Sequence, residues 1–419
     1  MGKLGLSLTG SYLGYQVQNL FGGAGKKEER RKAFQHTASR KIRAELQSLK
    51  GAVMKIGQAL SMQTHLLPFE ATEELANLQM RAPAMHATLA RARFKSSLGK
   101  YPEEVFKEFA PEPLAAASLG QVHRAVTKDG QIVAVKIQYP AIRTAIENDF
   151  KLLRSATLPT QFSGHSPSAV IEELERGILK ETDYLNEARN LEFFGHALAP
   201  LPYVSVPRPL PEYSTDRVLT MTFLEGGTVD EYLHANPSQK QRDLLGYRLV
   251  ELFHYQLRKV HALHSDPHPG NYLFDKEGHV ALVDFGSVSH FSARMIEIIK
   301  CFTDKVWLRG DPGIQEMCHL VCGKQAKEAP QRARRTIDLT IEFYNTIFPG
   351  GPVNFGDGKI ILILTKLWKE FLKNKLVNPD LIFASRAEMG MYNLLHRIGA
   401  RVDTTEILNR VTKMKGPEK

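Results

Sequence analysis

The sequence predicts an α+β protein in which a strand-rich part precedes a mostly helical part. Between Pro113 and Pro140 apolar residues recur with a period of two, and Lys128-Asp129-Gly130 is an Asp-Gly turn signal, so this stretch predicts a β-hairpin. After residue 237 apolar residues recur mainly at helical steps of three and four. The 419 residues are enough for two or three lobes. The predicted parts are a basic helical segment (1–110), a strand-rich part (111–225) and a helical part (226–419).

Apolar periodicity and helix breakers predict the individual elements. The expected helices cover Ser39–Gln63, 69–80, 86–99, 102–109, 141–157, 168–195, 237–262 and a series beginning at about Ser292. Breaks in that last series are expected near Gly310, Gly323, Pro349–Pro352 and Pro379. Val218–Gly227 is predicted to be a strand that runs into a pair of glycines.

The stretch from His264 to Gly286 contains a second hairpin pattern, HSDPHPGNYLFDKEGHVALVDFG. An apolar run, Tyr272–Phe274, is followed by a polar turn, Asp275–Gly278, and a second apolar run, Val280–Val283. A hairpin of this kind brings together the residues that flank it.

Asn271 and Asp284 flank this hairpin and are therefore expected to lie side by side. Two oxygen ligands on adjacent strand ends suit Mg²⁺, which otherwise takes waters and phosphate oxygens. Asp266, just outside the pair, can orient a nucleophile or accept its proton. This layout is that of a phosphoryl-transfer catalytic loop followed by a DFG metal site. The alternative is that each Asp only caps a local turn.

The predicted first hairpin contains a pattern for binding the phosphates of a nucleotide. Lys136 in VAVK is the expected phosphate-contacting lysine, and Gly120 stands sixteen residues before it. Ala115 and Ala117 occupy the first two glycine positions of a G-x-G-x-x-G pattern, and Gly120 occupies the third. A Cβ at each alanine should hold the backbone farther from the phosphates. The predicted nucleotide site comprises Ala115, Ala116, Ala117, Ser118, Gly120, Val122, Ala134, Lys136, Met221, Thr222 and Phe223.

Met221 is placed near the adenine, with the backbone of Thr222–Leu224 donating and accepting hydrogen bonds. A kinase-like lobe needs a helix carboxylate to pair with its lysine, and Glu187 is the predicted partner. Glu181 and Asp183 form a further acidic pair, as metal ligands or ligands of phosphate-bound water. Solvent-facing charges on one long helix are the ordinary alternative.

The predicted helix Ser39–Gln63 carries the sequence KIGQ, in which Lys55 and Gln58 share one face. An apolar stripe on this helix needs a partner surface, and the rest of the chain offers the only large one. If the stripe packs there, Lys55 and Gln58 can point toward the phosphates. A lysine and a glutamine on an exposed helix face are the alternative.

The net charge of +10 belongs to the first 100 residues, which hold 16 Lys and Arg against 6 Asp and Glu. No base-reading motif accompanies this charge, so an anionic membrane surface is preferred to nucleic acid as the partner. A solvated basic face is the alternative. Three cysteines are too few for a disulfide framework and favour an intracellular protein. No run of 18 apolar residues occurs, so no transmembrane helix is expected.

The sequence after Gly286 lacks the long activation segment and the APE motif of a protein kinase. The next helical pattern begins at about Ser292, which leaves no room for the usual platform that holds a protein substrate.

These features together resemble the UbiB/ADCK family of atypical protein-kinase-like proteins, of the AarF type. The shared motifs are KIGQ, AAASLGQV, ETDYLNEA, HSDPHPGN, VDFG and RAEMGMY, and the resemblance spans residues 40–400. It implies a bilobal kinase-like fold with an N-terminal helical KxGQ extension packed across the active site and a mostly helical C-lobe. It also implies Mg-ATP binding, weak ATPase activity, and support of ubiquinone or other isoprenoid-lipid metabolism at a membrane.

Carried over by position, the resemblance implies an ion pair of Lys136 with Glu187 and a catalytic Asp266. It implies metal ligation by Asn271 and Asp284, an acidic motif of Glu181 and Asp183, and entry of Lys55 and Gln58 into the site. The expected partners are the nucleotide, an anionic membrane surface, and quinone or isoprenoid lipids or their biosynthetic enzymes. The expected location is cytoplasmic, or peripheral at the inner face of the membrane.

Three functions remain open at this point: an ATPase or small-molecule or lipid kinase, a genuine protein kinase, and a nucleotide-binding scaffold without turnover. The complete set Lys136, Asp266, Asn271 and Asp284 favours turnover, and the missing activation segment argues against a protein substrate.

Overall fold

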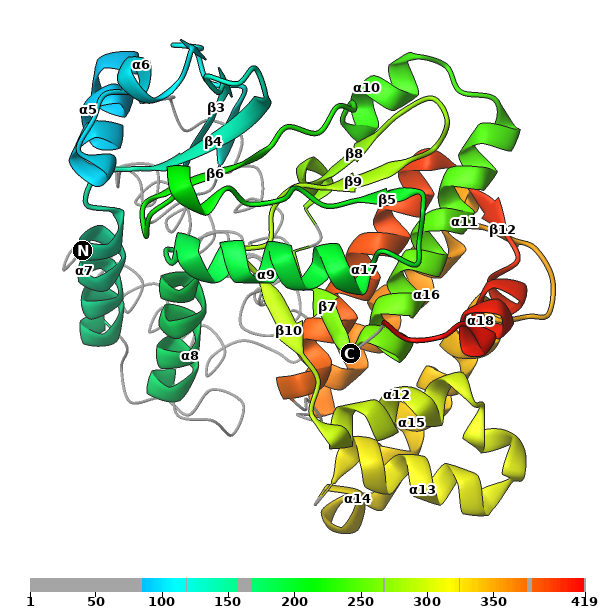
Figure 1. The fold of residues 1–419 in the computed structure, drawn as a ribbon. Coiled ribbons are helices and arrows are strands. Elements are labelled where there is room, and N and C mark those ends of the chain that lie inside the picture. Colours follow the sequence, from blue (N-terminus) through cyan, green and yellow to red (C-terminus); the bar gives the residue numbers. More distant parts are fainter. Residues whose placement is uncertain are drawn as a thin grey trace, which may run out of the picture. The chain divides into compact units, whose positions relative to one another are not determined.

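The computed structural model describes residues 85–117, 119–156, 167–266, 268–323, 325–374 and 379–417. Its internal contacts divide the chain into two compact units (Figure 1). The first unit includes the described residues up to Asn186 and the segment Leu210–Met221, and the second includes Glu187–Pro209 and the chain from Thr222 onward. The helices predicted at Ser39–Gln63 and 69–80 lie outside the described residues.

A small antiparallel sheet forms the centre of the first unit. The elements are α5 (Ala87–Leu98), α6 (Pro102–Val105), β1 (Glu108–Phe109), β2 (Ala115–Ala117), β3 (Gly120–Val126), β4 (Ile132–Gln138), α7 (Ile142–Ala156), α8 (Pro167–Lys180), a 3-10 turn (Pro211–Tyr213) and β6 (Val218–Thr222). The strand order is β1-β3-β4-β6, and β2 pairs with the other half of β3. Pairing of β3 with β4 confirms the predicted first hairpin, with Gly130 in its turn at φ +92°.

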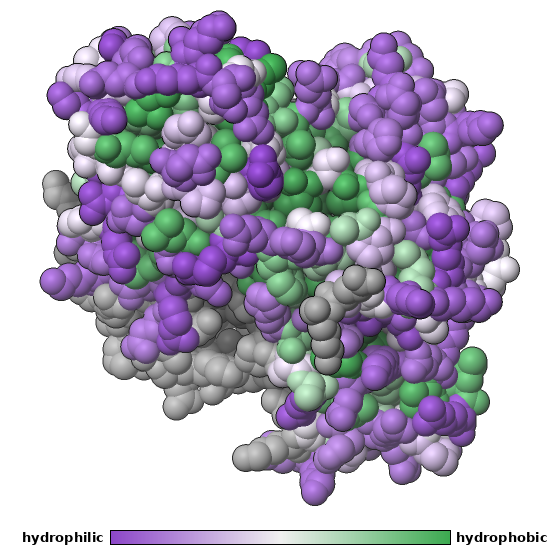
Figure 2. Space-filling model, in the orientation of Figure 1, coloured by the Kyte–Doolittle hydropathy of each residue, from purple (hydrophilic) through white to green (hydrophobic). Residues whose placement is uncertain are grey.

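The period-two pattern of β4 separates a core face from a second face. Val133, Val135 and Ile137 are fully buried, and they belong to the same apolar cluster as Ala90 and Phe94 of α5. On the face drawn in Figure 2, α5 and α6 present mainly hydrophilic side chains to solvent. Burial of this cluster fixes α5 on one side of the sheet and leaves the other face for other contacts.

A neutral hydrogen-bonded chain also lies on the core face of β3. The Gln121 side chain accepts the Met85 N–H at 2.7 Å and donates to the Met85 carbonyl at 3.2 Å. Gln121 Nε2 also contacts His123 Nε2 at 2.8 Å, and His123 Nδ1 contacts the Ala110 carbonyl at 2.8 Å. Since a carbonyl only accepts, Nδ1 carries the proton and Nε2 accepts. Burial lowers the pKa of His123 and keeps the ring neutral.

Two predicted helices differ from the structure. The helix expected over 102–109 ends at Val105, because the next residues form β1 and pair with β3, Phe109 opposite Ala125. The helix expected over 168–195 is two helices, α8 and α9 (Tyr184–Ala197), separated at 181–183. Asp183 causes the second start, because its Oδ1 accepts the N–H groups of Leu185 and Asn186, both at 3.1 Å.

The described residues of the second unit are mainly helical and form three small sheets. Its elements are α9, β5 (Val204–Ser205), α10 (Val229–His234), α11 (Gln239–Tyr255), a π-helical turn (Gln256–Val260), β7 (Ala262–His264), a 3-10 turn (Pro269–Asn271), β8 (Tyr272–Phe274), β9 (Val280–Leu282), β10 (Val288–His290), α12 (Ala293–Thr303), a 3-10 turn (Val306–Arg309), α13 (Asp311–Cys322), α14 (Gln325–Glu328), α15 (Pro330–Ile347), β11 (Val353–Asn354), a 3-10 turn (Phe355–Asp357), α16 (Lys359–Asn374), α17 (Pro379–Ile398), β12 (Arg401–Val402) and α18 (Thr404–Lys413). β7 pairs with β10, β11 pairs with β12, and β9 lies between β5 and β8. This mixture of helices and sheets confirms the predicted α+β class.

A buried carboxylate of α11 holds the last helix, α18, in contact with it. Glu251 of α11 is 1% exposed, accepts the Tyr203 hydroxyl hydrogen bond at 2.7 Å, and forms an ion pair with Arg410 Nε at 2.6 Å. Lys259 Nζ donates to the Thr412 carbonyl at 2.9 Å, and the Tyr255 hydroxyl donates to the Lys415 carbonyl at 3.3 Å. These contacts hold α11 in place from its middle to its C-terminal end.

Gly120 is required by packing. A Cβ at this position would lie 2.3 Å from the Ile137 carbonyl oxygen and 2.7 Å from the Tyr184 hydroxyl oxygen. We therefore predict that Gly120→Ala lowers the free energy of unfolding by about 1–3 kcal/mol, measured by denaturant unfolding. Gly195→Ala in α9 is the matched control, because no atom lies within 4 Å of its Cβ position. It should change stability by no more than about 1 kcal/mol, in the stabilising direction. Equal effects of the two substitutions would contradict the packing requirement.

His254 of α11 makes stability depend on pH. Its ring is buried, and among the described residues Nδ1 has no hydrogen-bond partner. Burial, with a smaller contribution from Arg258, lowers the pKa from 6.5 to about 3. Between these values the unfolded chain binds the extra proton, so stability falls as pH falls, by about 1.4 kcal/mol per unit. We predict that wild type loses this much relative to His254→Leu, measured by unfolding between pH 7 and pH 4. A constant difference between the two proteins over that range would refute it.

Candidate active site

The loop after β7 brings Asp266 and Asn271 together. Asn271, the last residue of a 3-10 turn, donates from Nδ2 to Asp266 Oδ2 at 2.8 Å. The N–H of His268 donates to Asp266 Oδ1 at 3.3 Å. This orientation of the amide commits its nitrogen to Asp266, and among the described residues Asn271 Oδ1 has no partner. The loop therefore presents an uncharged oxygen acceptor beside a half-buried carboxylate.

The β8–β9 hairpin places Asp284 next to this loop. Tyr272 pairs with Leu282, and the N–H of Val283 donates to the Asn271 carbonyl at 3.1 Å. This confirms the predicted second hairpin and brings its two flanking segments side by side. The Asp284 carboxylate accepts the N–H of Gly286 at 2.9 Å. An amide oxygen and a carboxylate on neighbouring backbone segments form a donor set of the kind that Mg²⁺ prefers.

His264 links the two halves of the site. Its Nε2 contacts the main-chain carbonyl of Asp284, so Nε2 carries the proton. The N–H of His264 donates to the buried Gln256 side chain at 2.9 Å. Gln256 is the first residue of a π-helical turn, a feature that often occurs at functional sites. The sequence does not single out Gln256, because a glutamine in a helical pattern gives no signal of its own.

Phe285 is fixed on both sides. Its ring is fully buried, edge-on to His264 with centroids 5.0 Å apart, and it packs against Phe194 at the same distance. Asn190 of α9 donates from Nδ2 to the Phe285 carbonyl at 2.8 Å. Asn190 is a second residue to which no pattern in the sequence assigns a role in the site. Side chains from β7 and α9 thus set the backbone that carries Asp284.

In the first unit, the predicted nucleotide residues share one face of the sheet. Gly120, Val122, Ala134 and Lys136 alternate with the core residues of β3 and β4, and Val122 stands opposite Lys136 in the register. Ala115 of β2 pairs with Val122. The alanine-rich segment is therefore a strand with a tight connection to β3, and Ser118 in that connection lies outside the described residues.

The remaining residues of the predicted site are on different elements of the chain. Lys136 is 6% exposed, with Nζ 5.2 Å from the centroid of the Tyr184 ring. Glu187 is fully buried in the first turn of α9, and its pairing with Lys136 stays a prediction. Glu181 and Asp183 are in the connection between α8 and α9, not on one long helix. Lys55 and Gln58 lie outside the described residues.

The residues predicted to contact adenine, Met221 to Leu224, are only partly available for it. Met221 is buried at the end of the first unit. The N–H of Thr222 donates to the Arg208 carbonyl at 2.9 Å, and its hydroxyl accepts the Arg208 N–H at 2.9 Å. The Thr222 N–H is therefore already hydrogen-bonded within the second unit. Of the predicted backbone contacts to adenine, those of Phe223 and Leu224 remain.

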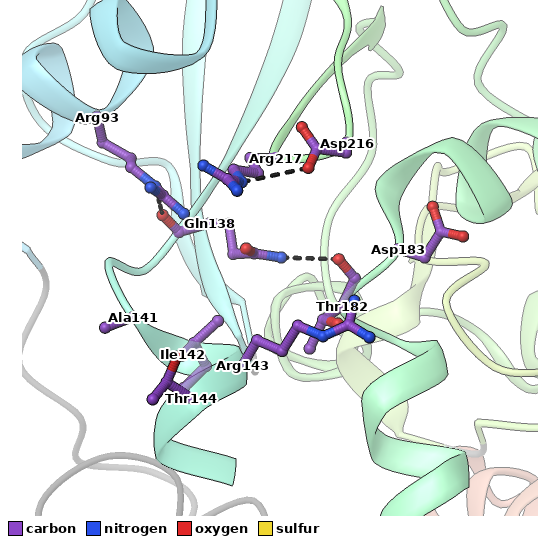
Figure 3. Close-up of a pocket in the computed structure, with 10 residues that line it drawn as sticks. All are labelled: Arg93, Gln138, Ala141, Ile142, Arg143, Thr144, Thr182, Asp183, Asp216 and Arg217. Atoms are coloured by element: carbon purple, nitrogen blue, oxygen red, sulfur yellow. Dashed lines mark hydrogen bonds and ion pairs between the residues drawn. The ribbon is translucent and has the colours of Figure 1, made fainter. Parts of the chain in front are cut away.

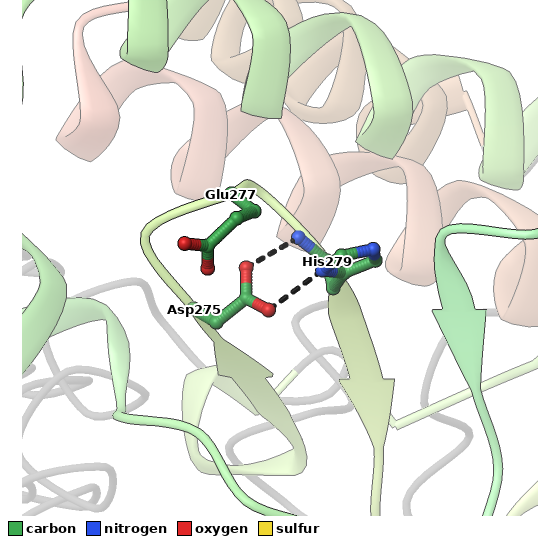
Figure 4. Close-up of side chains that lie close together, drawn as sticks. All are labelled: Asp275, Glu277 and His279. Atoms are coloured by element: carbon green, nitrogen blue, oxygen red, sulfur yellow. Dashed lines mark hydrogen bonds and ion pairs between the residues drawn. The ribbon is translucent and has the colours of Figure 1, made fainter.

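A separate acidic group lies at the tip of the β8–β9 hairpin (Figure 4). Ligand atoms of Asp275, Glu277 and His279 lie within 4.8 Å of one another. Asp275 accepts the His279 N–H at 2.8 Å and contacts Nδ1 of the same ring at 2.6 Å, while Gly278 adopts φ +76°. These hydrogen bonds explain why the three side chains lie together: they stabilise the polar turn that the sequence predicts.

Only six residues separate Gly286 from the helix α12. Within them, β10 pairs with β7 and Ser292 caps α12 by accepting the Met295 N–H at 3.2 Å. This confirms the predicted helix start at Ser292 and the short connection after the DFG sequence. No helix of the described ranges has the length and apolar character needed to cross a bilayer.

The loop after β7, the β8–β9 hairpin and the Asp284–Gly286 segment are arranged as in a protein of the kinase-like class. Residues 77–317 match the ABC1 atypical kinase-like domain. The chain is 31% identical over 311 residues to the Arabidopsis thaliana protein ACTIVITY OF BC1 COMPLEX KINASE 7, chloroplastic, covering 73% of this chain and 42% of that protein. It is 34% identical to mouse AarF domain-containing protein kinase 1 over 57% of this chain and 46% of the relative.

Among solved structures, the complex of Rv3197 with erythromycin from Mycobacterium tuberculosis matches with a TM-score of 0.61 and 25% identity. The match covers 92% of this chain and 98% of that one. The chain belongs to the ABC1 atypical kinase-like family, which includes the AarF and UbiB/ADCK proteins, and this confirms the resemblance drawn from its motifs. It spans less than half the length of the curated relatives named here.

Proposed function

We propose that this chain binds Mg-ATP and hydrolyses it, or transfers its terminal phosphate to a small molecule or lipid, in support of ubiquinone or other isoprenoid-lipid metabolism. The observation that carries the proposal is the geometry of Asp266, Asn271 and Asp284. Two of these side chains are hydrogen-bonded, and the third follows the strand that pairs beside them.

In this proposal Asn271 Oδ1 and the Asp284 carboxylate hold the metal ion. When bound, Mg²⁺ neutralises charge on the phosphate oxygens. Asp266 orients the attacking hydroxyl or water and accepts its proton, and the Asn271 amide keeps the carboxylate in place. Lys136 contacts the phosphates from the second face of the first-unit sheet, with Glu187 as its partner. Burial of both side chains is consistent with an ion pair shielded from solvent.

The short connection after Gly286 supports a substrate other than a protein, because it has no room for a peptide platform. Lys55 and Gln58 are proposed to enter the same site from the N-terminal extension and to fill the space that a peptide would need. The excess positive charge of residues 1–100 supports contact with an anionic membrane surface. A genuine protein kinase and a scaffold without turnover are the competing functions.

Metal-dependent nucleotide binding is the first test. Mg-ATP at one hundred times its Kd should stabilise the folded chain by about 2.7 kcal/mol and raise the Tm. Asp284→Asn should abolish that rise. Asp275→Asn, which changes a carboxylate in the same hairpin, is the matched control and should keep it. Retention of the full rise by Asp284→Asn would remove the metal assignment.

Phosphate release then separates the three functions. Release without a protein acceptor, stimulated by anionic vesicles, is the expected result. Transfer of phosphate to added protein would favour a protein kinase. Binding of Mg-ATP with neither release nor transfer would favour a scaffold.

A further inference from the structure

A cavity in the first unit gathers three arginines (Figure 3). Asp183 of the predicted acidic pair lines it, whereas none of the predicted nucleotide-binding residues does. Its volume is about 320 Å³. Arg93 comes from α5, Arg143 from the first turn of α7, and Arg217 from the residue before β6. Arg93 and Arg217 are more than 120 residues apart in the sequence, so only folding brings their guanidinium groups to one cavity.

Gln138, the last residue of β4, organises the cavity wall. Its side chain is buried and donates to the Thr182 carbonyl at 2.8 Å. Its carbonyl accepts from Arg93 Nε at 3.3 Å, and its N–H donates to the Arg217 carbonyl at 3.1 Å. One buried residue thus connects α5, the segment before β6 and the turn before α9 at the end of β4, so several elements together form the cavity wall.

The carboxylates of the cavity already have partners. Asp216 forms an ion pair with Arg217 at 3.2 Å, and Asp183 caps α9. In contrast, Arg93 uses only Nε within the described residues, so both Nη groups remain available. Burial, followed by the nearby Arg217 guanidinium, lowers the pKa of Arg93. Two like charges held close together favour an anion between them.

The start of α7 adds donors of the same kind. Ile142 donates its N–H to the Tyr139 carbonyl at 3.4 Å, and Ala145 donates to Ala141 at 2.9 Å. Within the described residues the N–H groups of Arg143 and Thr144 have no partner. The first turn of α7 also holds no acidic side chain. Unpaired N–H groups at a helix start complement an anion, in support of the three arginines.

We propose that this cavity binds a phosphate monoester dianion. Arg93 and Arg143 contact its oxygens in the forked geometry that guanidinium offers to phosphate, and the α7 N–H groups complete the set. Figure 3 shows Arg93 reaching toward Gln138 and Arg143 reaching toward Thr182, from two walls of the cavity. The ion pair of Arg143 with Glu147 is solvent-exposed and weak, so Arg143 is free to turn to the ligand. The phosphate belongs to a soluble metabolite or to a lipid headgroup.

The test is a titration of the full chain with inorganic phosphate at constant ionic strength, followed by calorimetry. Arg93→Gln and Arg143→Gln should each weaken binding at least tenfold, about 1.4 kcal/mol. Arg91→Gln is the matched control, because Arg91 lies on the same helix as Arg93 and pairs with Glu103 outside the cavity. Lys136→Ala removes the predicted phosphate contact of the nucleotide site and shows how much of the phosphate binds there. Arg91→Gln should bind phosphate as wild type does.

Wild-type binding by both Arg93→Gln and Arg143→Gln, or loss of binding in Lys136→Ala alone, would overturn the proposal. Thermal unfolding of each variant shows whether it is folded, and the exposed Arg143 provides a test even if Arg93→Gln unfolds. Glycerol 3-phosphate and phosphatidylcholine vesicles with phosphatidic acid then separate the two sources. Binding of the soluble ester assigns a free metabolite, and arginine-dependent binding to the vesicles alone assigns a lipid headgroup. Absence of arginine-dependent binding to every probe would also overturn it.

Discussion

The contact between the His264 imidazole and the main-chain carbonyl of Asp284 is the constraint on which the candidate site depends. It joins the end of β7 to the segment that follows β9, so the loop with Asp266 and the segment with Asp284 cannot move independently. The main-chain bond from Val283 to Asn271 provides a second connection between the same two segments. Both connections involve backbone atoms. They therefore fix the backbone from which the Asp266 and Asp284 side chains extend, and they do not use the carboxylate oxygens.

The helices support this constraint from both ends. Gln256 holds the backbone of His264 and belongs to the π-helical turn that continues α11. Glu251, one turn earlier, is buried and fastens α11 to Arg410 of the last helix. On the other side, Asn190 of α9 holds the carbonyl of Phe285. Three helices, α9, α11 and α18, therefore support the backbone that carries the candidate site.

The sequence predicts those parts of the fold that local patterns determine. Both hairpins, the start of α12 at Ser292 and the proximity of Asn271 to Asp284 follow from apolar periodicity and turn residues. Long-range contacts account for the differences. Strand β1 forms because Phe109 pairs with Ala125 of β3. The apolar periodicity that predicts a helix there contains no information about this long-range pairing. The break between α8 and α9 depends on the Asp183 side chain, which caps α9. The helical periodicity of the sequence continues through Asp183 and therefore does not reveal the break.

The candidate site shows the same division. Asp266, Asn271 and Asp284 stand in one motif, whereas Gln256 and Asn190 act through single hydrogen bonds that no spacing predicts. The arginine cavity is the clearest case, because Arg93 and Arg217 become neighbours only when both contact the backbone of Gln138 in the folded chain. Composition shows the excess of basic residues, and only the fold shows which of them share a cavity.

The most direct test of the account is the position of a metal ion in crystals grown with Mn²⁺ and a non-hydrolysable ATP analogue. Anomalous scattering identifies the ion without reference to activity. The account predicts a peak at about 2.1 Å from both Asn271 Oδ1 and an Asp284 carboxylate oxygen, the distance that octahedral sites of this type require. A nucleotide bound with its metal on other residues, or a peak only at the turn of Asp275 and His279, would contradict it.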